Sequence, residues 1–247
     1  VMLLLRNWYF VQASPNDPRA RSVEFDDKLM GELIRFVSSH EVGHTLGLRH
    51  NFGSSSTVPV EKLRDKKWLE KNGHTPSIMD YARFNYVAQP EDNIGDTGIM
   101  PRIGDYDNWA IEWGYRRFNN YKTPDAEKEH LNKWVIKNLK NERLWFGTET
   151  NPLDPRSQSE QVGDNAMVAS TYGIKNLERI VNNLGKWTEK PNEDFANLEM
   201  MYDQVTGQFR RYLGHVSKYI GGQMETPKTV EQSGPVYEVV AKKDQKE

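Results

Sequence analysis

The chain has 247 residues, a formal net charge of -2 and no cysteine. Its length allows a substantial core, and its seven tryptophans and 11% aromatic content argue against disorder. The balanced charge gives no electrostatic footprint for nucleic acid or an anionic membrane. Without cysteine, disulfides and thiolate metal sites are excluded. No window approaches eighteen apolar residues, so no transmembrane helix is expected; the sequence does not indicate an oligomeric state.

The first 50 residues are expected to contain a strand, a turn and a long helix. Residues 1–12 are apolar, then aromatic and β-branched, which favours an extended segment. Residues 14–21 are rich in Pro, Asn and Asp and predict a turn. A long helix is expected from about 26 to 46, with Asp26 or Asp27 as the N-cap and Gly47 following its end.

The remainder of the chain predicts further helices joined by polar segments. Glycine, proline and polar residues make 147–163 the best internal boundary and 89–107 a long surface loop. The tail after Gly221 is expected to be extended or disordered. Helical patterns cover residues 60–71, 106–118, 125–139, 166–184 and 193–219.

The decisive segment is residues 40–50, HEVGHTLGLRH. On a helix, His40 and His44 project from one face one turn apart, so both imidazoles can reach a single cation. Glu41 is displaced by about 100° around the helix from His40, which places it beside such a cation without making it a ligand. Gly47 permits a sharp backbone turn that other residues resist. This turn can bring His50 round as a third ligand.

Three neutral imidazoles suit zinc better than calcium or magnesium, which prefer oxygen ligands. They leave one coordination position open, which is typical of a catalytic site. Zinc lowers the pKa of a bound water from about 15.7 to roughly 7. Glu41 could accept the proton of that water during attack on a peptide carbonyl and pass it to the departing amine. The segment therefore predicts an endopeptidase with one catalytic zinc ion and a peptide or protein substrate.

The alternative interpretation is a helix whose histidines bind no metal. That interpretation must also account for a glycine and a third histidine at matching offsets, in a chain with only six histidines. The extended motif therefore favours the zinc site. The other three histidines (His74, His130 and His215) are isolated and are expected to be structural or on the surface.

Residues 40–50 resemble the HExxHxxGxxH signature of the metzincin clan of zinc endopeptidases. That clan also has a downstream Met-turn, and residues 76–81, PSIMDY, are similar to it. The resemblance implies that Met79 lies beneath the zinc as a hydrophobic floor. It also implies that Tyr81 matches a tyrosine that, in some members, approaches the metal and helps to stabilise the tetrahedral intermediate. A purely structural phenol is the alternative for Tyr81.

Residues 50–55 and 77–90 resemble a group of large bacterial metzincin-like peptidases, in which the segment 103–115 also recurs. The resemblance covers roughly residues 15–118. It implies an exported protein that is periplasmic, on the cell surface or secreted, with its signal outside this chain.

The fold implied by the resemblance is mainly α. An α+β metzincin-like catalytic core, with the long zinc-binding helix and the Met-turn, would occupy residues 1–118. A mainly helical C-terminal subdomain would occupy residues 119–247. Metzincins place a sheet and helices before the zinc helix, whereas only 39 residues precede His40. Much of that N-terminal sheet is therefore expected to be missing, which puts substrate binding by this segment alone in question.

Two other classes of function are open to the sequence. One is a zinc-binding module that has lost activity and binds peptide or glycan, although the intact Glu41 argues against it. The other is zinc-dependent hydrolysis of a non-peptide amide. Separately, the loop at residues 91–96 has oxygen ligands that could hold calcium, but it lacks EF-hand spacing, and a solvated loop is the favoured interpretation.

Overall fold

The computed structural model describes residues 2–149 and 151–246 as a mainly α-helical protein. The predicted mainly α fold is therefore confirmed. Within the described residues, the only strands are β1 (Gln223–Glu225) and β2 (Tyr237–Val239), which pair antiparallel. The helices are α1 (Met2–Ala13), α2 (Asp27–Thr45), α3 (Lys66–Asn72), α4 (Gly95–Ile99), α5 (Asp105–Tyr115), α6 (Pro124–Asn138), α7 (Ala166–Thr188) and α8 (Ala196–Ser217).

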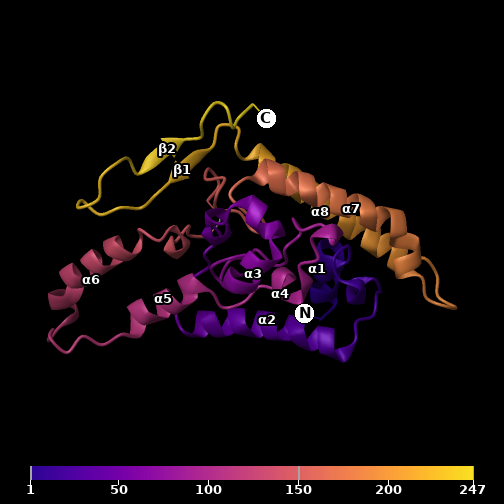
Figure 1. Cartoon of the computed structure of the whole chain (residues 1–247), viewed down its shortest axis with the longest axis horizontal. Coiled ribbons are helices and arrows are strands. Elements are labelled where there is room, and N and C mark those ends of the chain that lie inside the picture. Colours follow the sequence, from indigo (N-terminus) through magenta and orange to yellow (C-terminus); the bar gives the residue numbers. More distant parts are fainter. Residues whose placement is uncertain (1, 150, 247) are drawn as a thin grey trace.

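The helices enclose an irregular central region (Figure 1). Helix α2 runs along the lower edge of this view, and the long pair of α7 and α8 runs along the upper right. Helix α1 lies between them and contacts all three. The β1–β2 pair and helices α5 and α6 extend on the opposite side of the centre.

The N-terminal segment is helix α1, so the predicted extended conformation is wrong. Leu5, Tyr9 and Ala13 are completely buried and lie four residues apart, which is the spacing of one helix face. The Tyr9 hydroxyl donates a 2.6 Å hydrogen bond to Asp17 just beyond the helix. A short apolar run has no periodicity that separates a strand from a buried helix. Packing against α2, α7 and α8 decides in favour of the helix.

Helix α2 begins as predicted, with Asp26 as its N-cap. The Asp26 carboxylate accepts a 2.7 Å hydrogen bond from the Leu29 amide, which satisfies one of the free N–H groups of the first turn. Leu29 and Leu33 are fully buried on the inner face of the helix. The same inner face carries His40 and Gly43, so the face that anchors the helix also directs the first histidine inwards.

The region between α2 and α5 has little regular structure but supplies much of the core. The predicted helix at 60–71 is divided into a 3-10 helix at Val60–Arg64 and helix α3. The predicted surface loop at 89–107 is wrong, because it contains helix α4 and the start of α5. Ile94 and Ile99 are 2% and 1% exposed, and their burial holds a helical turn in a sequence whose glycine content indicates a loop.

The helices predicted in the second half of the chain are confirmed as α5 to α8, with ends that differ by a few residues. The polar stretch 147–163 packs into the protein. Its Glu160 and Gln161 are 0% and 1% exposed; the Glu160 amide donates to the Tyr81 carbonyl over 2.8 Å, and Ser55 Oγ donates to the Gln161 carbonyl over 2.9 Å. This stretch therefore does not form a solvated linker. The division into domains 1–118 and 119–247 stays a prediction.

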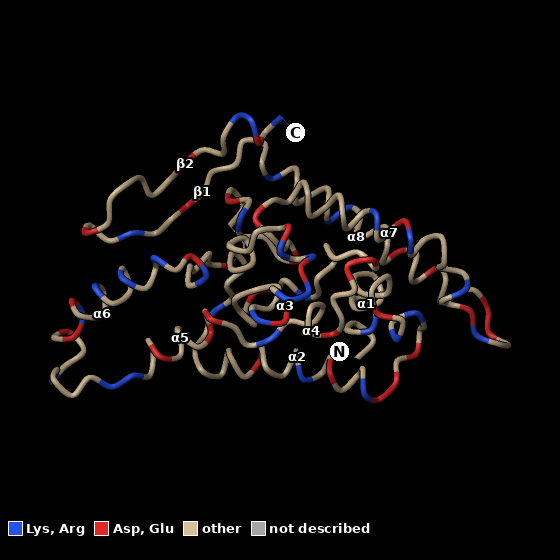
Figure 2. Tube along the Cα trace, in the orientation of Figure 1, with Lys and Arg blue, Asp and Glu red and all other residues tan. Residues whose placement is uncertain are grey.

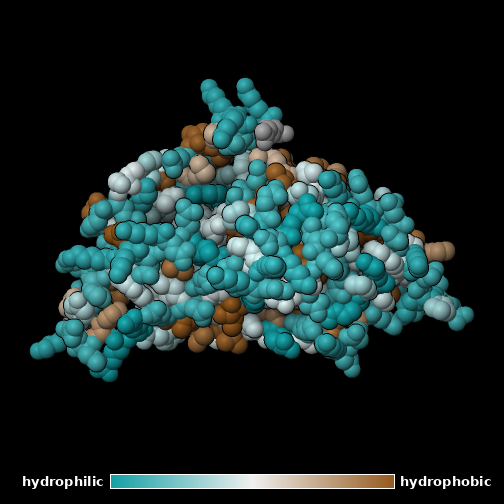
Figure 3. Space-filling view, in the orientation of Figure 1, coloured by the Kyte–Doolittle hydropathy of each residue, from teal (hydrophilic) through white to brown (hydrophobic). Residues whose placement is uncertain are grey.

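The surface is predominantly polar. Figure 2 shows basic and acidic residues interspersed along the helices, without a segregated face of one sign. Figure 3 shows a largely hydrophilic face interrupted by smaller hydrophobic patches. Large exposed hydrophobic side chains include Ile34 and Val42 on α2 and Leu46 just after it. Within the described residues, no helix is both long and apolar enough to cross a membrane.

Candidate metal centre

The structure brings His40, His44 and His50 together. His40 Nε2 lies 3.1 Å from His44 Nε2, which lies 3.0 Å from His50 Nε2. Ligand nitrogens of the three residues all lie within 4.8 Å of one another. Zinc with nitrogen ligands at 2.0–2.1 Å in a tetrahedral arrangement separates those nitrogens by roughly 3.3 Å. The spacing of the imidazoles therefore fits a zinc ion.

The other nitrogen of each ring faces an oxygen acceptor. His40 Nδ1 lies 2.8 Å from the Ile78 carbonyl, and His44 Nδ1 lies 2.9 Å from the Leu48 carbonyl. A carbonyl oxygen can only accept, so both Nδ1 atoms donate, and the tautomer that this selects leaves Nε2 to face the centre. His50 Nδ1 lies 3.5 Å from a carboxylate oxygen of Glu149. Such outer acceptors orient metal-binding imidazoles and raise their basicity.

The protonation behaviour of two of the rings also favours metal binding. Burial lowers the pKa of His40, and the hydrogen bond to Ile78 opposes this only in part. Burial likewise lowers the pKa of His50, with Glu149 acting in the opposite direction. Both rings are therefore held in the neutral form, which is the form that coordinates a metal. His44 Nε2 lies about 3 Å from the Nε2 atoms of both His40 and His50, and nitrogen lone pairs at such a distance repel one another unless a cation or a proton lies between them.

Gly47 explains how the third imidazole arrives. Its φ of +81° lies in the left-handed region, which glycine adopts without the steric penalty of a Cβ atom. The Gly47 amide donates to the His44 carbonyl over 2.9 Å, and the Leu48 amide donates to the Gly43 carbonyl over 3.1 Å. This pair of bonds is a Schellman motif. It ends α2 and also directs the Leu48 carbonyl back towards the His44 ring.

Met79 lies directly against the helix between the first two histidines. A Cβ atom at Gly43 would be 2.3 Å from Met79 Sδ, so only glycine leaves room for this side chain. Met79 is fully buried, and its carbonyl accepts a 3.0 Å hydrogen bond from the Asn51 amide, next to His50. The residue therefore contacts the helix that carries two of the histidines and is hydrogen-bonded beside the third.

The backbone beneath His40 is held by Asp107 at the start of α5. Its carboxylate accepts hydrogen bonds from Ser77 Oγ at 2.6 Å, the Ile78 amide at 2.7 Å and the Gly104 amide at 2.8 Å. Burial raises the pKa of Asp107, and these donors act in the opposite direction. Because the Ile78 carbonyl accepts from His40, Asp107 fixes the segment that orients the first imidazole.

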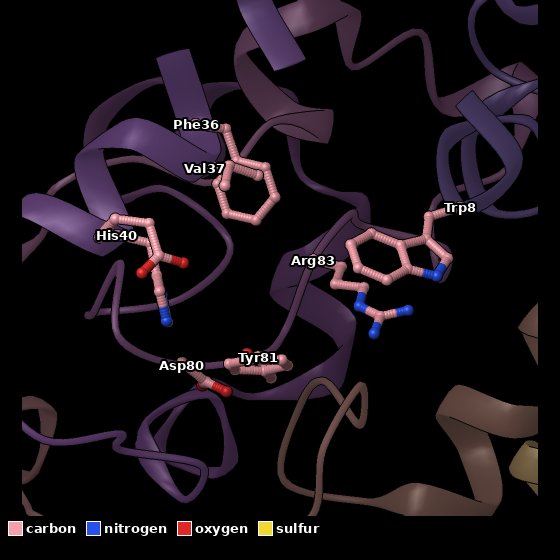
Figure 4. Close-up of a pocket in the computed structure, with 8 residues that line it drawn as sticks. Trp8, Phe36, Val37, His40, Asp80, Tyr81 and Arg83 are labelled. Atoms are coloured by element: carbon pink, nitrogen blue, oxygen red, sulfur yellow. The ribbon is translucent and has the colours of Figure 1, made fainter. Parts of the chain in front are cut away.

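Glu41 and Tyr81 adjoin the three histidines. The Tyr81 ring lies edge-on to the His40 and His50 rings, with centroids 5.2 Å and 4.8 Å away. Glu41 is exposed on α2, and together with Tyr81 it lines a cavity of about 90 Å³. Trp8 and Arg83 form the side of the cavity opposite His40 (Figure 4). The predicted catalytic pair thus shares one cavity with the His40 imidazole.

Several residues of this site were not predicted from the sequence. Gly43 could have been recognised as a small residue between two histidines on the same helix. Asp107 stands in the segment 103–115 that recurs in similar peptidases, which was a signal without a stated role. No local pattern distinguishes Glu149, which lies near His50, or Arg83, which lies across the cavity from His40, because both are distant in sequence from those histidines.

The acidic loop at residues 91–96 makes pairs with arginines. Asp92 lies 2.6 Å from Arg64, and Asp96 lies 3.0 Å from Arg19. Among the described residues, the one group of three or more His, Asp, Glu or Cys side chains close enough to share a metal ion is the three histidines. Calcium binding by the loop stays the less favoured alternative that the sequence left open.

A helix that presents two imidazoles, followed by a glycine turn that presents a third, has the form of a mononuclear metal site with an open position. The chain belongs to the Met-zincin family, whose model matches residues 22–247. The predicted relation to the metzincin clan is thereby confirmed, and the match extends past residue 118 through the C-terminal helices. No curated protein and no solved structure matches the chain. The family is one of zinc-dependent peptidases, so the chain is a metalloprotease by family, and the histidine cluster fits zinc.

Proposed function

We propose that this protein is a zinc endopeptidase in which His40, His44 and His50 hold one zinc ion and Glu41 is the general base. The observation that carries the proposal is the convergence of the three imidazoles, two of which donate through Nδ1 to backbone carbonyls. A structural zinc site has four protein ligands, whereas three leave a position for water or substrate. The adjoining cavity gives a substrate access to Glu41.

Zinc in this site would acidify water and polarise the carbonyl of the scissile peptide. Glu41 removes a proton from the attacking water as its oxygen bonds to the carbonyl carbon. The carbon–nitrogen bond then breaks, and Glu41 returns the proton to the leaving amine. The products are a carboxylic acid and an amine, which at neutral pH become a carboxylate and an ammonium group, so the proton transfers balance without a further reactant.

Met79 and Tyr81 have supporting roles in this proposal. Met79 acts as the Met-turn residue, because its side chain fills the space beneath Gly43 on the zinc helix. The Tyr81 hydroxyl would donate to the developing oxyanion. Tyr81→Phe distinguishes this role from a structural one: loss of a transition-state donor lowers kcat with little change in KM, whereas an unchanged kcat would leave Tyr81 as a packing residue.

The test is cleavage of a peptide library by the zinc-loaded full chain, with and without chelator. We expect about one zinc per chain and cleavage that chelation abolishes. Glu41→Gln should retain zinc but lose activity by a factor of about 10² or more. Glu61→Gln, at an exposed position outside the cavity, is the matched control and should remain active.

The outcomes separate the alternatives. Undiminished activity of Glu41→Gln would remove Glu41 from the mechanism. Zinc binding and peptide binding without cleavage would indicate a non-catalytic zinc module. Cleavage of non-peptide amides in place of peptides would change the substrate class. We also propose that the protein is exported, on the basis of the similar bacterial peptidases; cell fractionation that finds it only in the cytoplasm would contradict this.

A further inference from the structure

The cavity beside the histidines is lined by apolar side chains near His40 and by a positively charged side chain on the opposite side. Phe36 and Val37, one helical turn before His40 on α2, supply apolar wall. Across the cavity, the Arg83 guanidinium lies flat against the Trp8 ring, with Cζ 3.5 Å from the ring centroid (Figure 4). A side chain entering from the histidine side would therefore pass apolar groups before it meets a cation.

The positive charge of Arg83 is only partly neutralised. Its Nη1 lies 2.5 Å from Glu160 Oε1, and the same carboxylate oxygen lies 3.1 Å from Nη1 of Arg211 on α8. Glu160 also accepts a 3.0 Å hydrogen bond from Gln12. Two guanidinium groups thus share one carboxylate, so the cluster carries a net positive charge. Burial lowers the pKa of Arg83 to about 10, and Glu160 acts in the opposite direction, so the guanidinium is charged at neutral pH.

Arg83 also has unused hydrogen-bonding capacity. The residue is 9% exposed, and no partner among the described residues accepts from its buried Nε. A buried donor without a partner is unfavourable, and more so on a charged group. The backbone of Arg83 has a positive φ of 51°, a conformation that is uncommon for residues other than glycine. A carboxylate in the cavity would offset the remaining positive charge of the cluster.

The two other acidic residues of the cavity do not fill this role. Asp80 directs Oδ2 to the Ser55 amide at 2.6 Å and to Thr75 Oγ1 at 3.0 Å. Burial raises the pKa of Asp80 to about 8 against the effect of these donors, so its carboxyl group is largely neutral at pH 7. Glu41 lies next to His40 on α2 and is the general base of the proposed function, so it is not available as the partner of Arg83.

We propose that this cavity is a specificity subsite that selects an acidic side chain, above all glutamate, at a residue adjoining the scissile bond, with Arg83 as the specificity-determining residue. The inference rests on the proposed peptidase function. The methylene groups of the glutamate would lie against Phe36 and Val37 while its carboxylate pairs with Arg83. An apolar substrate side chain of similar size would fill the same space but would leave the guanidinium without a partner. Glutamine has the shape of glutamate without its charge, so comparison of the two isolates the ionic interaction.

The test uses pairs of peptides that are identical except for Glu or Gln at one residue flanking the scissile bond. For the zinc-loaded full chain, we expect kcat/KM to be at least tenfold higher with Glu at one of the two flanking positions, which corresponds to about 1.4 kcal/mol. Arg83→Gln should abolish this preference. Arg210→Gln is the matched control, because it removes an exposed cation on α8 that does not line the cavity, and it should keep the preference.

Binding measurements keep this inference separate from the proposed function. The same peptides are titrated calorimetrically against zinc-loaded Glu41→Gln protein, where we expect the Glu peptide to bind at least tenfold more tightly. The binding measurement tests the subsite even if the wild-type protein cleaves neither peptide. Absence of cleavage would overturn the peptidase function but not the subsite. If Arg83→Gln fails to fold, Arg83→Lys is used, and we expect it to retain a reduced preference for Glu. Equal affinity and equal cleavage of the Glu and Gln peptides, or a preference for Leu or Phe over Glu, would overturn the subsite.

Discussion

Gly43 is the position at which one added methyl group tests how Met79 supports the zinc helix. A Cβ atom there would lie 2.3 Å from Met79 Sδ and 3.3 Å from its Cε, closer than the 3.5–4.0 Å of a favourable non-bonded contact. The Met79 backbone cannot easily retreat, because its carbonyl accepts from Asn51 and its amide donates to Ser77 Oγ. Gly43→Ala must therefore displace the Met79 side chain or the helix.

The expected stability change is the balance of two effects. Alanine in place of glycine stabilises a helix interior by about 0.5–1 kcal/mol, whereas overpacking a core costs about 1–3 kcal/mol. We expect Gly43→Ala to lose about 1–2 kcal/mol of unfolding free energy. Gly31→Ala, in the same helix, meets nothing within 4 Å and should gain about 0.5–1 kcal/mol. At about 2–4 °C per kcal/mol for a chain of this size, the two melting temperatures should differ clearly and in opposite directions.

The assay is thermal unfolding of both variants followed by circular dichroism, together with zinc affinity from competition with a chelator. We expect Gly43→Ala to bind zinc about tenfold more weakly, as for the loss of other groups that support metal ligands, and Gly31→Ala to bind it normally. If Gly43→Ala were as stable as Gly31→Ala and bound zinc equally well, the contact with Met79 would not help to hold the site.

Three further predictions concern the surroundings of the site and the fold. Asp107→Asn removes one of two acceptor oxygens from the segment that orients His40, so it should lose about 1–3 kcal/mol of stability and bind zinc more weakly; unchanged chelator competition would contradict that positioning role. Chelation should lower the melting temperature reversibly, since zinc at about 100 times its Kd stabilises the folded state by about 2.7 kcal/mol; an unchanged melting temperature would argue against a site formed only in the folded chain. Burial lowers the pKa of His215 to about 4, below its unfolded value of about 6.5, so its contribution to stability is present above pH 6.5 and is lost as the pH falls towards 4. Urea unfolding between pH 4 and 7 should show that His215→Gln loses less unfolding free energy on acidification than the wild type does. Identical pH dependence in the two proteins would show that His215 does not contribute to acid destabilisation.

The sequence was informative wherever the relevant interactions are local. Residues 40–50 lie on one helix and its terminal turn, so helical periodicity and the freedom of Gly47 predict the convergence of three imidazoles without knowledge of the remaining fold. The Asp26 cap was predicted for the same reason, because it acts within one turn. The later amphipathic helices α7 and α8 are long enough for their periodicity to be recognised.

The sequence could not identify interactions between distant segments. Residues 2–13 form a helix because they pack against α2, α7 and α8. A short apolar run does not predict which elements it will contact. The same limitation applies to α4, whose helical turn depends on burial of Ile94 and Ile99.

At the metal centre, some features follow from local sequence and others from the packing of distant segments. The sequence by itself predicted which side chains can bind zinc, because helical spacing puts His40 and His44 on one face and Gly47 permits the turn that brings His50 to them. Only the tertiary structure decided which outer groups orient them: the Ile78 carbonyl, the Asp107 carboxylate that holds Ile78, and Met79 beneath Gly43. The charge of the adjoining cavity was decided in the same way, because Arg83 reaches it from a turn that packs against α1 and Glu160. Ligand identity is a property of local geometry, whereas orientation and charge depend on which distant segments the fold packs together.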